Sequence, residues 1–176
     1  ADAVVVVQPG ETADLPYPSQ TQNFHHEIEL VVAIGKGGKN IKAADAMGHV
    51  FGYAAGLDMT RRDLQMEMRK AGRPWCIGKA FDRSAPITPI VPAAQAGDVE
   101  KADIWISVNG TDRQRSNVSK LIWNLAEVIE HLSASWELQP GDLIYSGTPE
   151  GVGAVVRGDL MAGGVSGVGE LRVKVV

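Results

Sequence analysis

Residues Ile104 to Val118 read IWISVNGTDRQRSNV, a β-branched and aromatic run, an Asn-Gly pair and a polar run of similar length. Asn109-Gly110 favours a two-residue hairpin turn, because both central positions of such a turn require positive φ, which asparagine and glycine tolerate. We therefore predict an antiparallel hairpin with strands Ile104–Val108 and Thr111–Val118.

Short apolar runs between Gly- and Pro-rich turns continue this pattern along the chain. Further strands are predicted at Val4–Val7, Glu27–Ile34, Val50–Asp58, Leu143–Ser146 and Glu170–Val176, and Pro86–Val91 is expected to pair at a sheet edge. The segments from Gln8 to Gln22 and from Gly147 to Gly169 are expected to be loops. Because strands dominate and do not alternate with helices, we predict one domain over residues 1–176 of the α+β class, mostly β.

Few helices are predicted. Ala43–Gly48 favours one short helix, and Thr60 with Asp63 resembles a capping box that opens a helix through Lys70, ending near Gly72. Ser119 is predicted to cap the clearest amphipathic helix, whose apolar positions follow helical spacing. These positions are Leu121, Ile122, Leu125, Val128, Ile129 and Leu132.

Composition excludes several classes of partner. The formal net charge is −4 and the chain has no Lys/Arg-rich tract, which argues against nucleic acid or an anionic membrane as partner. No apolar run approaches the roughly 20 residues of a spanning helix. A single cysteine, Cys76, and a start without a signal peptide favour a cytoplasmic protein with a small-molecule partner. Since Ala1 is not Met, we expect the natural product to begin upstream.

Three carboxylates are candidates for a metal site. Glu27 and Glu29 are two residues apart on a predicted strand and therefore share one face, where two buried anions need a compensating cation. Asp58 ends the next predicted strand and offers a third oxygen ligand for a hard divalent ion. An exposed strand face for the pair and a turn role for Asp58 remain open, as does ligation of a transition metal by His25 or His26, of which only one can face the site.

Polar groups elsewhere suit an anionic ligand. Arg61, Arg62 and Gln65 lie on the first turns of a predicted helix, whose amino-terminal dipole favours anions. A capped surface helix with solvated arginines is the alternative. Lys79 either pairs with Asp82 or lies near an anionic ligand. Gly147-Thr148-Pro149 follows a strand, so that its hydroxyl and N–H groups can form an anion cradle.

Four blocks in this order resemble the fumarylacetoacetate hydrolase family across nearly the whole chain. They are HHEIEL at 25–30, GLDMTRRDLQ at 56–65, GKAFD at 78–82 and SGTP at 146–149. The resemblance implies a mixed β-roll or sandwich fold of the family's C-terminal-domain type and a homodimer. It also implies Mg²⁺ or Mn²⁺, with Ca²⁺ as a substitute in crystals, held by Glu27, Glu29 and Asp58.

The resemblance further implies an enzyme that hydrolyses the C–C bond of an acylpyruvate in aromatic catabolism, with fumarylpyruvate as the expected 2-oxo acid substrate. The implied catalytic residues are Lys79, Gln65 and Thr148, and the implied substrate-binding residues are Arg62, Gly147 and His25. An isomerase or decarboxylase of a related 2-oxo or 2-hydroxydienoic acid is the alternative, followed by a non-catalytic protein that binds metal or a 2-oxo acid.

One feature of the family is missing from the sequence. Members of this kind carry a His and a Glu on a short mobile segment upstream, where they activate the attacking water. We expect these residues to precede Ala1 and name His25 or His26 as the substitute base within the chain.

Overall fold

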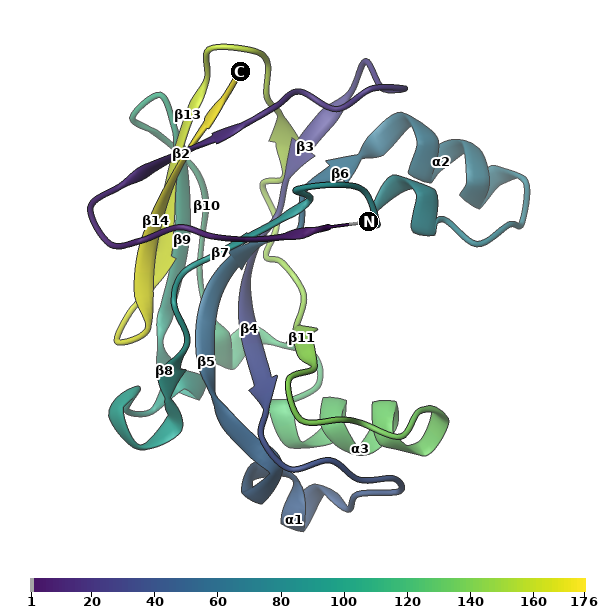
Figure 1. Cartoon of the computed structure of the whole chain (residues 1–176), viewed down its shortest axis with the longest axis vertical. Helices are drawn as coiled ribbons and strands as arrows, with labels where there is room; N and C mark the ends of the chain where they lie inside the picture. Colours follow the sequence, from purple (N-terminus) through teal and green to yellow (C-terminus); the bar gives the residue numbers. More distant parts are fainter. Residues whose placement is uncertain (1) are drawn as a thin grey trace.

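The computed structural model describes residues 2–176, which fold into three β-sheets with short helices at the periphery (Figure 1). The strands are β1 Val4–Val6, β2 Thr12–Leu15, β3 Phe24–His26, β4 Ile28–Ile34, β5 Val50–Leu57, β6 Thr60–Arg61, β7 Ala85–Ile87, β8 Val91–Pro92, β9 Asp103–Val108, β10 Thr111–Asn117, β11 Leu143–Tyr145, β12 Gly153–Ala154, β13 Leu160–Val165 and β14 Gly169–Val175. The predicted mostly-β class is confirmed.

The α-helices are few and short, as predicted. They are α1 Ala43–Ala46, α2 Arg62–Lys70 and α3 Leu125–Ser135, and the 3₁₀ turns are η1 Met47–His49, η2 Cys76–Gly78, η3 Ala93–Gln95, η4 Val99–Lys101 and η5 Val118–Lys120. No helix in the described part of the chain is long and apolar enough to cross a membrane.

Two larger sheets enclose the core. The first has the order β1-β7-β5-β4-β11, with β8 also pairing with β5, and the second has the order β10-β9-β13-β14-β2. Alternate residues of β4, such as Leu30 and Val32, join one apolar cluster with Ile106 of β9 and Val173 of β14. Because strand side chains alternate, the intervening residues of β4 face the other side of the sheet, where the polar site forms.

The predicted hairpin is confirmed as β9–β10. Asn109 has φ 51° and Gly110 has φ 78°, the two positive values that the Asn-Gly turn requires. A register shift between Asp112 and Gln114 then interrupts the pairing. This shift bears on the site, because Gln114 is buried whereas most of β10 is exposed.

Of the three predicted helix starts, Ala43 is confirmed as the start of α1, and the other two are wrong. Thr60 belongs to β6, pairs with His25 of β3 and is fully buried, and α2 begins at Arg62 without a side-chain cap. Ser119 lies in η5, and α3 begins only at Leu125, after Asn124. The predicted apolar positions Leu121 and Ile122 therefore precede the helix, and Ile122 is 97% exposed.

Two predicted loops contain strands, and one predicted edge strand is internal. The first loop contains β2, which pairs in parallel with β14, and the glycine-rich loop contains β12 and β13. β7 lies between β1 and β5, although it contains Pro86. Ala85 donates to Ala3 and Ile87 accepts from Val7, so the missing N–H of Pro86 is not needed for pairing with β1.

Candidate metal centre

Strand register brings the three carboxylates together. Ile28 of β4 lies opposite Leu57 of β5, and the N–H of Asp58 donates to the carbonyl oxygen of Glu27 at 2.8 Å, which continues the ladder by one pair. Cross-strand neighbours face the same side of a sheet, so Asp58 joins the face that Glu27 shares with Glu29. Glu29 itself lies opposite Gly56, where a Cβ would collide with Val31 and Tyr145.

The trio fits a hard divalent cation. One oxygen from each of Glu27, Glu29 and Asp58 lies within 4.8 Å of the other two. Two oxygens that each lie about 2.0–2.6 Å from one ion are at most about 5 Å apart, so a single ion can contact all three. Glu27 and Glu29 are 7% and 4% exposed, which excludes the solvated-face alternative for this pair.

Burial has a marked effect on the acidity of Glu29. Loss of solvent raises the pKa of this carboxyl to about 8, although the N–H of Gly147 donates to Oε2 at 2.8 Å, and the charges of Asp58 and Glu27 add to the rise. Burial likewise raises the pKa of Asp58, against a hydrogen bond from Lys79. The raised pKa values of Glu29 and Asp58 indicate a candidate cation site, because a bound cation would stabilise the ionised carboxylates that burial disfavours.

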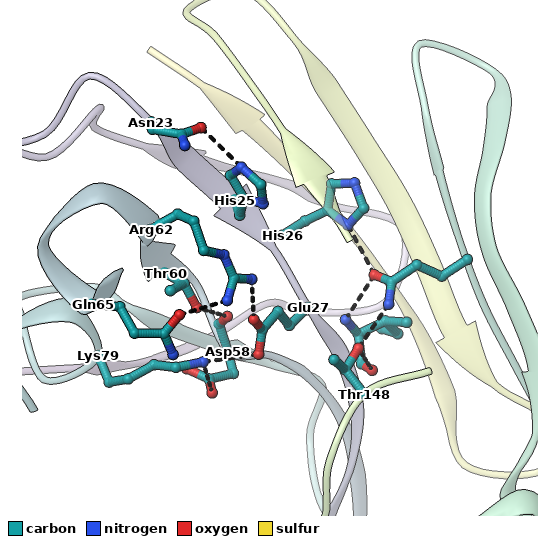
Figure 2. A network of polar contacts seen from close by, with 12 residues as sticks. Asn23, His25, His26, Glu27, Asp58, Thr60, Arg62, Gln65, Lys79 and Thr148 are labelled. Carbon is teal, nitrogen blue, oxygen red and sulfur yellow. Dashed lines mark hydrogen bonds and ion pairs between the residues drawn. The ribbon is translucent and has the colours of Figure 1, made fainter. Parts of the chain in front are cut away.

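Two basic side chains partly compensate the cluster (Figure 2). The Nζ atom of Lys79 lies 2.8 Å from Oε2 of Glu27 and 2.6 Å from Oδ2 of Asp58, and Arg62 forms an ion pair with Oε1 of Glu27. Lys79 therefore pairs with the trio rather than with Asp82, which settles the alternatives left by the sequence. No cation contacts Glu29 within residues 2–176.

The start of α2 places Gln65 beside these cations. Arg62 donates to Oε1 of Gln65 at 2.6 Å, so the amide and the guanidinium form one polar edge. η2 packs closely against this turn, since a Cβ at Gly78 would lie 3.0 Å from Cβ of Gln65. That close approach holds Lys79 next to the trio. Asp63 instead accepts from Thr21 and from the N–H of Gln22, and Arg61 stacks over Phe81, so neither residue joins the cluster.

The Ser146–Pro149 segment runs along β4 beyond the end of β11. Ser146 bonds to the carbonyl of Leu30 through both N–H and Oγ, and Oγ1 of Thr148 donates to the carbonyl of Ile28 at 2.8 Å. With Gly147 bound to Glu29, the segment supports the trio from the side opposite Lys79. The predicted anion cradle is corrected here, because the N–H of Gly147 is already taken by a protein carboxylate.

His25 and His26 face different surroundings, as alternation predicts. Nε2 of His25 lies 2.8 Å from Oδ1 of Asn23, and Nδ1 is buried without a hydrogen-bond partner among residues 2–176. Burial lowers the pKa of both imidazoles. His26 points to the other side and forms a hydrogen bond with Gln114, so it does not join the three carboxylates as a candidate metal ligand (Figure 2).

Gln114 is the residue of this region that sequence reasoning missed. It contacts His26, Ile28 and Thr148 from a strand that is otherwise polar and exposed. No local pattern separates it from its neighbours, because the register shift that turns it inward is a property of the paired strands.

A cavity of about 810 Å³ adjoins the other side of this region. It is lined by Gly147 and Thr148 together with residues of β10, η5 and α3, but by none of the three carboxylates. This cavity is therefore distinct from the candidate metal site.

The sequence and the fold were compared with known protein families and solved structures. The family described as "Fumarylacetoacetate (FAA) hydrolase C-terminal" matches residues 2–176. The chain belongs to the fumarylacetoacetate hydrolase family. Within that family, the fumarylpyruvate hydrolase of Ralstonia sp. is 52% identical over 163 residues, which cover 93% of this chain and 84% of the relative.

Two other family members bear on the site. The crystal structure of fumarylpyruvate hydrolase from Pseudomonas aeruginosa in complex with Mn²⁺ and pyruvate has a TM-score of 0.98 and 62% identity, covering 100% of this chain and 76% of that chain. The mitochondrial oxaloacetate tautomerase of Rattus norvegicus is 42% identical over 158 residues, covering 90% of this chain and 72% of the relative. The family therefore includes more than one reaction on 2-oxo acids.

Proposed function

We propose that this chain is a metal-dependent hydrolase that cleaves the C–C bond of an acylpyruvate, with fumarylpyruvate as substrate. The observation that carries the proposal is the converged trio Glu27, Glu29 and Asp58 in a chain 62% identical to a fumarylpyruvate hydrolase described with Mn²⁺ and pyruvate. Pyruvate is one product of the proposed reaction, and fumarate is the other.

The reaction requires stabilisation of a leaving enolate. Water adds to the carbonyl carbon of the acyl group, the bond to C3 of the pyruvate unit breaks, and the electron pair of that bond becomes the pyruvate enolate, which is then protonated at C3. A divalent ion held by the trio supplies Lewis acidity for the 2-oxo acid group. Mn²⁺ and Mg²⁺ are both suited to an all-carboxylate site.

Side chains of the chain complete this environment. Lys79 borders Glu27 and Asp58, so its ammonium group places positive charge next to the 2-oxo acid, where the enolate charge develops. Arg62 and Gln65, fixed to one another, present donors that orient the substrate carboxylate. Nδ1 of His25 is buried without a partner in the described part of the chain, and we assign water activation within that part to this imidazole.

The proposal also covers the cellular location, the pathway and the assembly of the enzyme. We place the enzyme in the cytoplasm, in aromatic catabolism, and as a homodimer. The net charge of −4 and the single cysteine agree with that location, and no basic tract competes for nucleic acid.

A tautomerase or related isomerase is the second candidate, because a 42% identical relative is an oxaloacetate tautomerase. Tautomerisation passes through the same enolate and needs no attacking water. A non-catalytic role agrees poorly with the buried trio, since clustering three acids away from solvent is costly without a cation.

The proposal is tested with the purified full-length protein, Mn²⁺ or Mg²⁺, and fumarylpyruvate. Loss of the conjugated diketone absorbance and formation of pyruvate are followed together, and chelation by EDTA is expected to stop both. Glu29→Gln should lose activity, whereas the same change at the exposed Glu170 should not. Tautomerisation of oxaloacetate without pyruvate release from fumarylpyruvate would favour the second candidate and overturn the first.

A further inference from the structure

Gln114 forms a complete hydrogen-bond set at the junction of three elements. Its side chain is 1% exposed, and Oε1 lies 2.8 Å from Nδ1 of His26 and 3.3 Å from the N–H of Ile28. Nε2 lies 2.7 Å from Oγ1 of Thr148 and 2.7 Å from the carbonyl oxygen of Pro149. An amide offers two lone pairs and two hydrogens, so every position is used.

The backbone fixes which way this amide points. The N–H of Ile28 can only donate and the carbonyl of Pro149 can only accept, so the oxygen of Gln114 must face Ile28 and the nitrogen must face Pro149. His26 therefore carries its hydrogen on Nδ1. Thr148 accepts from Gln114 and donates its own hydroxyl hydrogen to Ile28, so that hydroxyl is not a free donor for substrate.

This network continues to a candidate metal ligand. Thr148 follows Gly147, whose N–H donates to Oε2 of Glu29 at 2.8 Å. A second contact fixes the far end of the segment, because Gly151, with φ 98°, lies so close to the carbonyl oxygen of Arg113 that a Cβ would collide with it. The shifted register of β10 thus holds both ends of residues 147–151.

We propose that Gln114 is a positioning residue of the metal centre, which sets the geometry of Glu29 by holding residues 147–149 against β4. The inference rests on the metal dependence proposed above. Gln114 does not contact the carboxylates; it acts through Thr148, Pro149 and the N–H of Gly147. Groups that bond directly to a metal ligand, as the N–H of Gly147 does to Glu29, typically change metal affinity about 10–100-fold when they are lost, and Gln114 acts through this contact.

The test is Mn²⁺ titration of the full chain, by calorimetry or by the electron paramagnetic resonance signal of free Mn²⁺. Gln114→Met keeps the length and approximate volume of the side chain but removes all four hydrogen bonds. We expect this variant to bind Mn²⁺ at least about tenfold more weakly. Gln114→Asn keeps the amide but is one methylene too short to span both sides, so its affinity should be intermediate.

Ser133→Ala is the matched control. Ser133 is also fully buried, accepts from the N–H of Ile41 and donates to the carbonyl of Glu130. It lies in α3, which packs against α1 at the end of the molecule away from α2 (Figure 1). The variant should lower thermal stability without changing Mn²⁺ affinity, which separates positioning from general destabilisation.

The inference is overturned if Gln114→Met binds Mn²⁺ as tightly as the wild type, or, where that variant does not fold, if Gln114→Asn does so. Because the titration needs no substrate, a wild-type chain that binds Mn²⁺ but releases no pyruvate would overturn the proposed reaction and not this inference.

Discussion

Glu29 is the carboxylate of the trio that has no basic partner among residues 2–176. Glu27 is paired with Lys79 and Arg62, and Asp58 with Lys79, whereas Glu29 has only the N–H of Gly147. Burial without a cation raises its pKa to about 8. At neutral pH the metal-free site is therefore protonated at Glu29, and a divalent ion must displace that proton.

Metal affinity should consequently depend on pH. The sign follows from the raised pKa: below about 8 the proton competes with the cation, so each unit of pH lowered should weaken Mn²⁺ binding by up to about tenfold, whereas above 8 the affinity should level off. Calorimetric titrations on both sides of that value measure this. Glu29→Gln should bind weakly with a flatter pH profile, and an unchanged wild-type affinity below pH 8 would exclude the linkage.

At the residue scale, the sequence predicted the three clustered carboxylates better than the residues that hold them in place. Alternation placed Glu27 and Glu29 on one face, and a strand end placed Asp58 nearby. Convergence itself depends on register, which local sequence does not specify. Gln114 lay beyond prediction for the same reason, since its inward turn arises from a shift in pairing with β9.

Among the elements, α3 provides the sharpest test of a helix start. Asn124 accepts from the N–H of Glu127, and the Glu127 side chain accepts from the N–H of Asn124, a complete capping box. Asn124→Ala should lower the free energy of unfolding by about 1 kcal/mol, measured by urea denaturation. Ser119→Ala should have little effect, and a larger loss for Ser119→Ala would restore the longer helix predicted from sequence.

The two mispredicted helix starts have different physical causes. Ser119 lies in a 3₁₀ turn that Asn117 caps, and the capping box of Asn124 begins the helix later. For Thr60, pairing with a distant residue decides the conformation. Thr60 pairs with His25 and is extended for that reason. Most of α3 was predictable because its apolar periodicity is strong, whereas α2 was predicted from polar signals at its two ends.

For the whole molecule, strands were more predictable than sheets. Local patterns located β4, β5, β9, β10 and β14, but β2 was missed because it is stabilised by parallel pairing with β14, where Leu15 lies opposite Val175. Tertiary context of this kind overrides propensity in short strands. The mostly-β class followed from composition and turns, whereas the sheet order did not.

Metal binding should stabilise the entire fold. The trio joins the start of β4 to the end of β5, so its three oxygens converge only in the folded chain. An ion that binds the folded state alone adds about 2.7 kcal/mol at a concentration 100 times its dissociation constant. Saturating Mn²⁺ should therefore raise the melting temperature in scanning calorimetry, EDTA should reverse the rise, and Glu29→Gln should reduce it while Glu170→Gln keeps it. Equal melting temperatures with and without Mn²⁺ would show that the trio does not hold an ion in the folded chain.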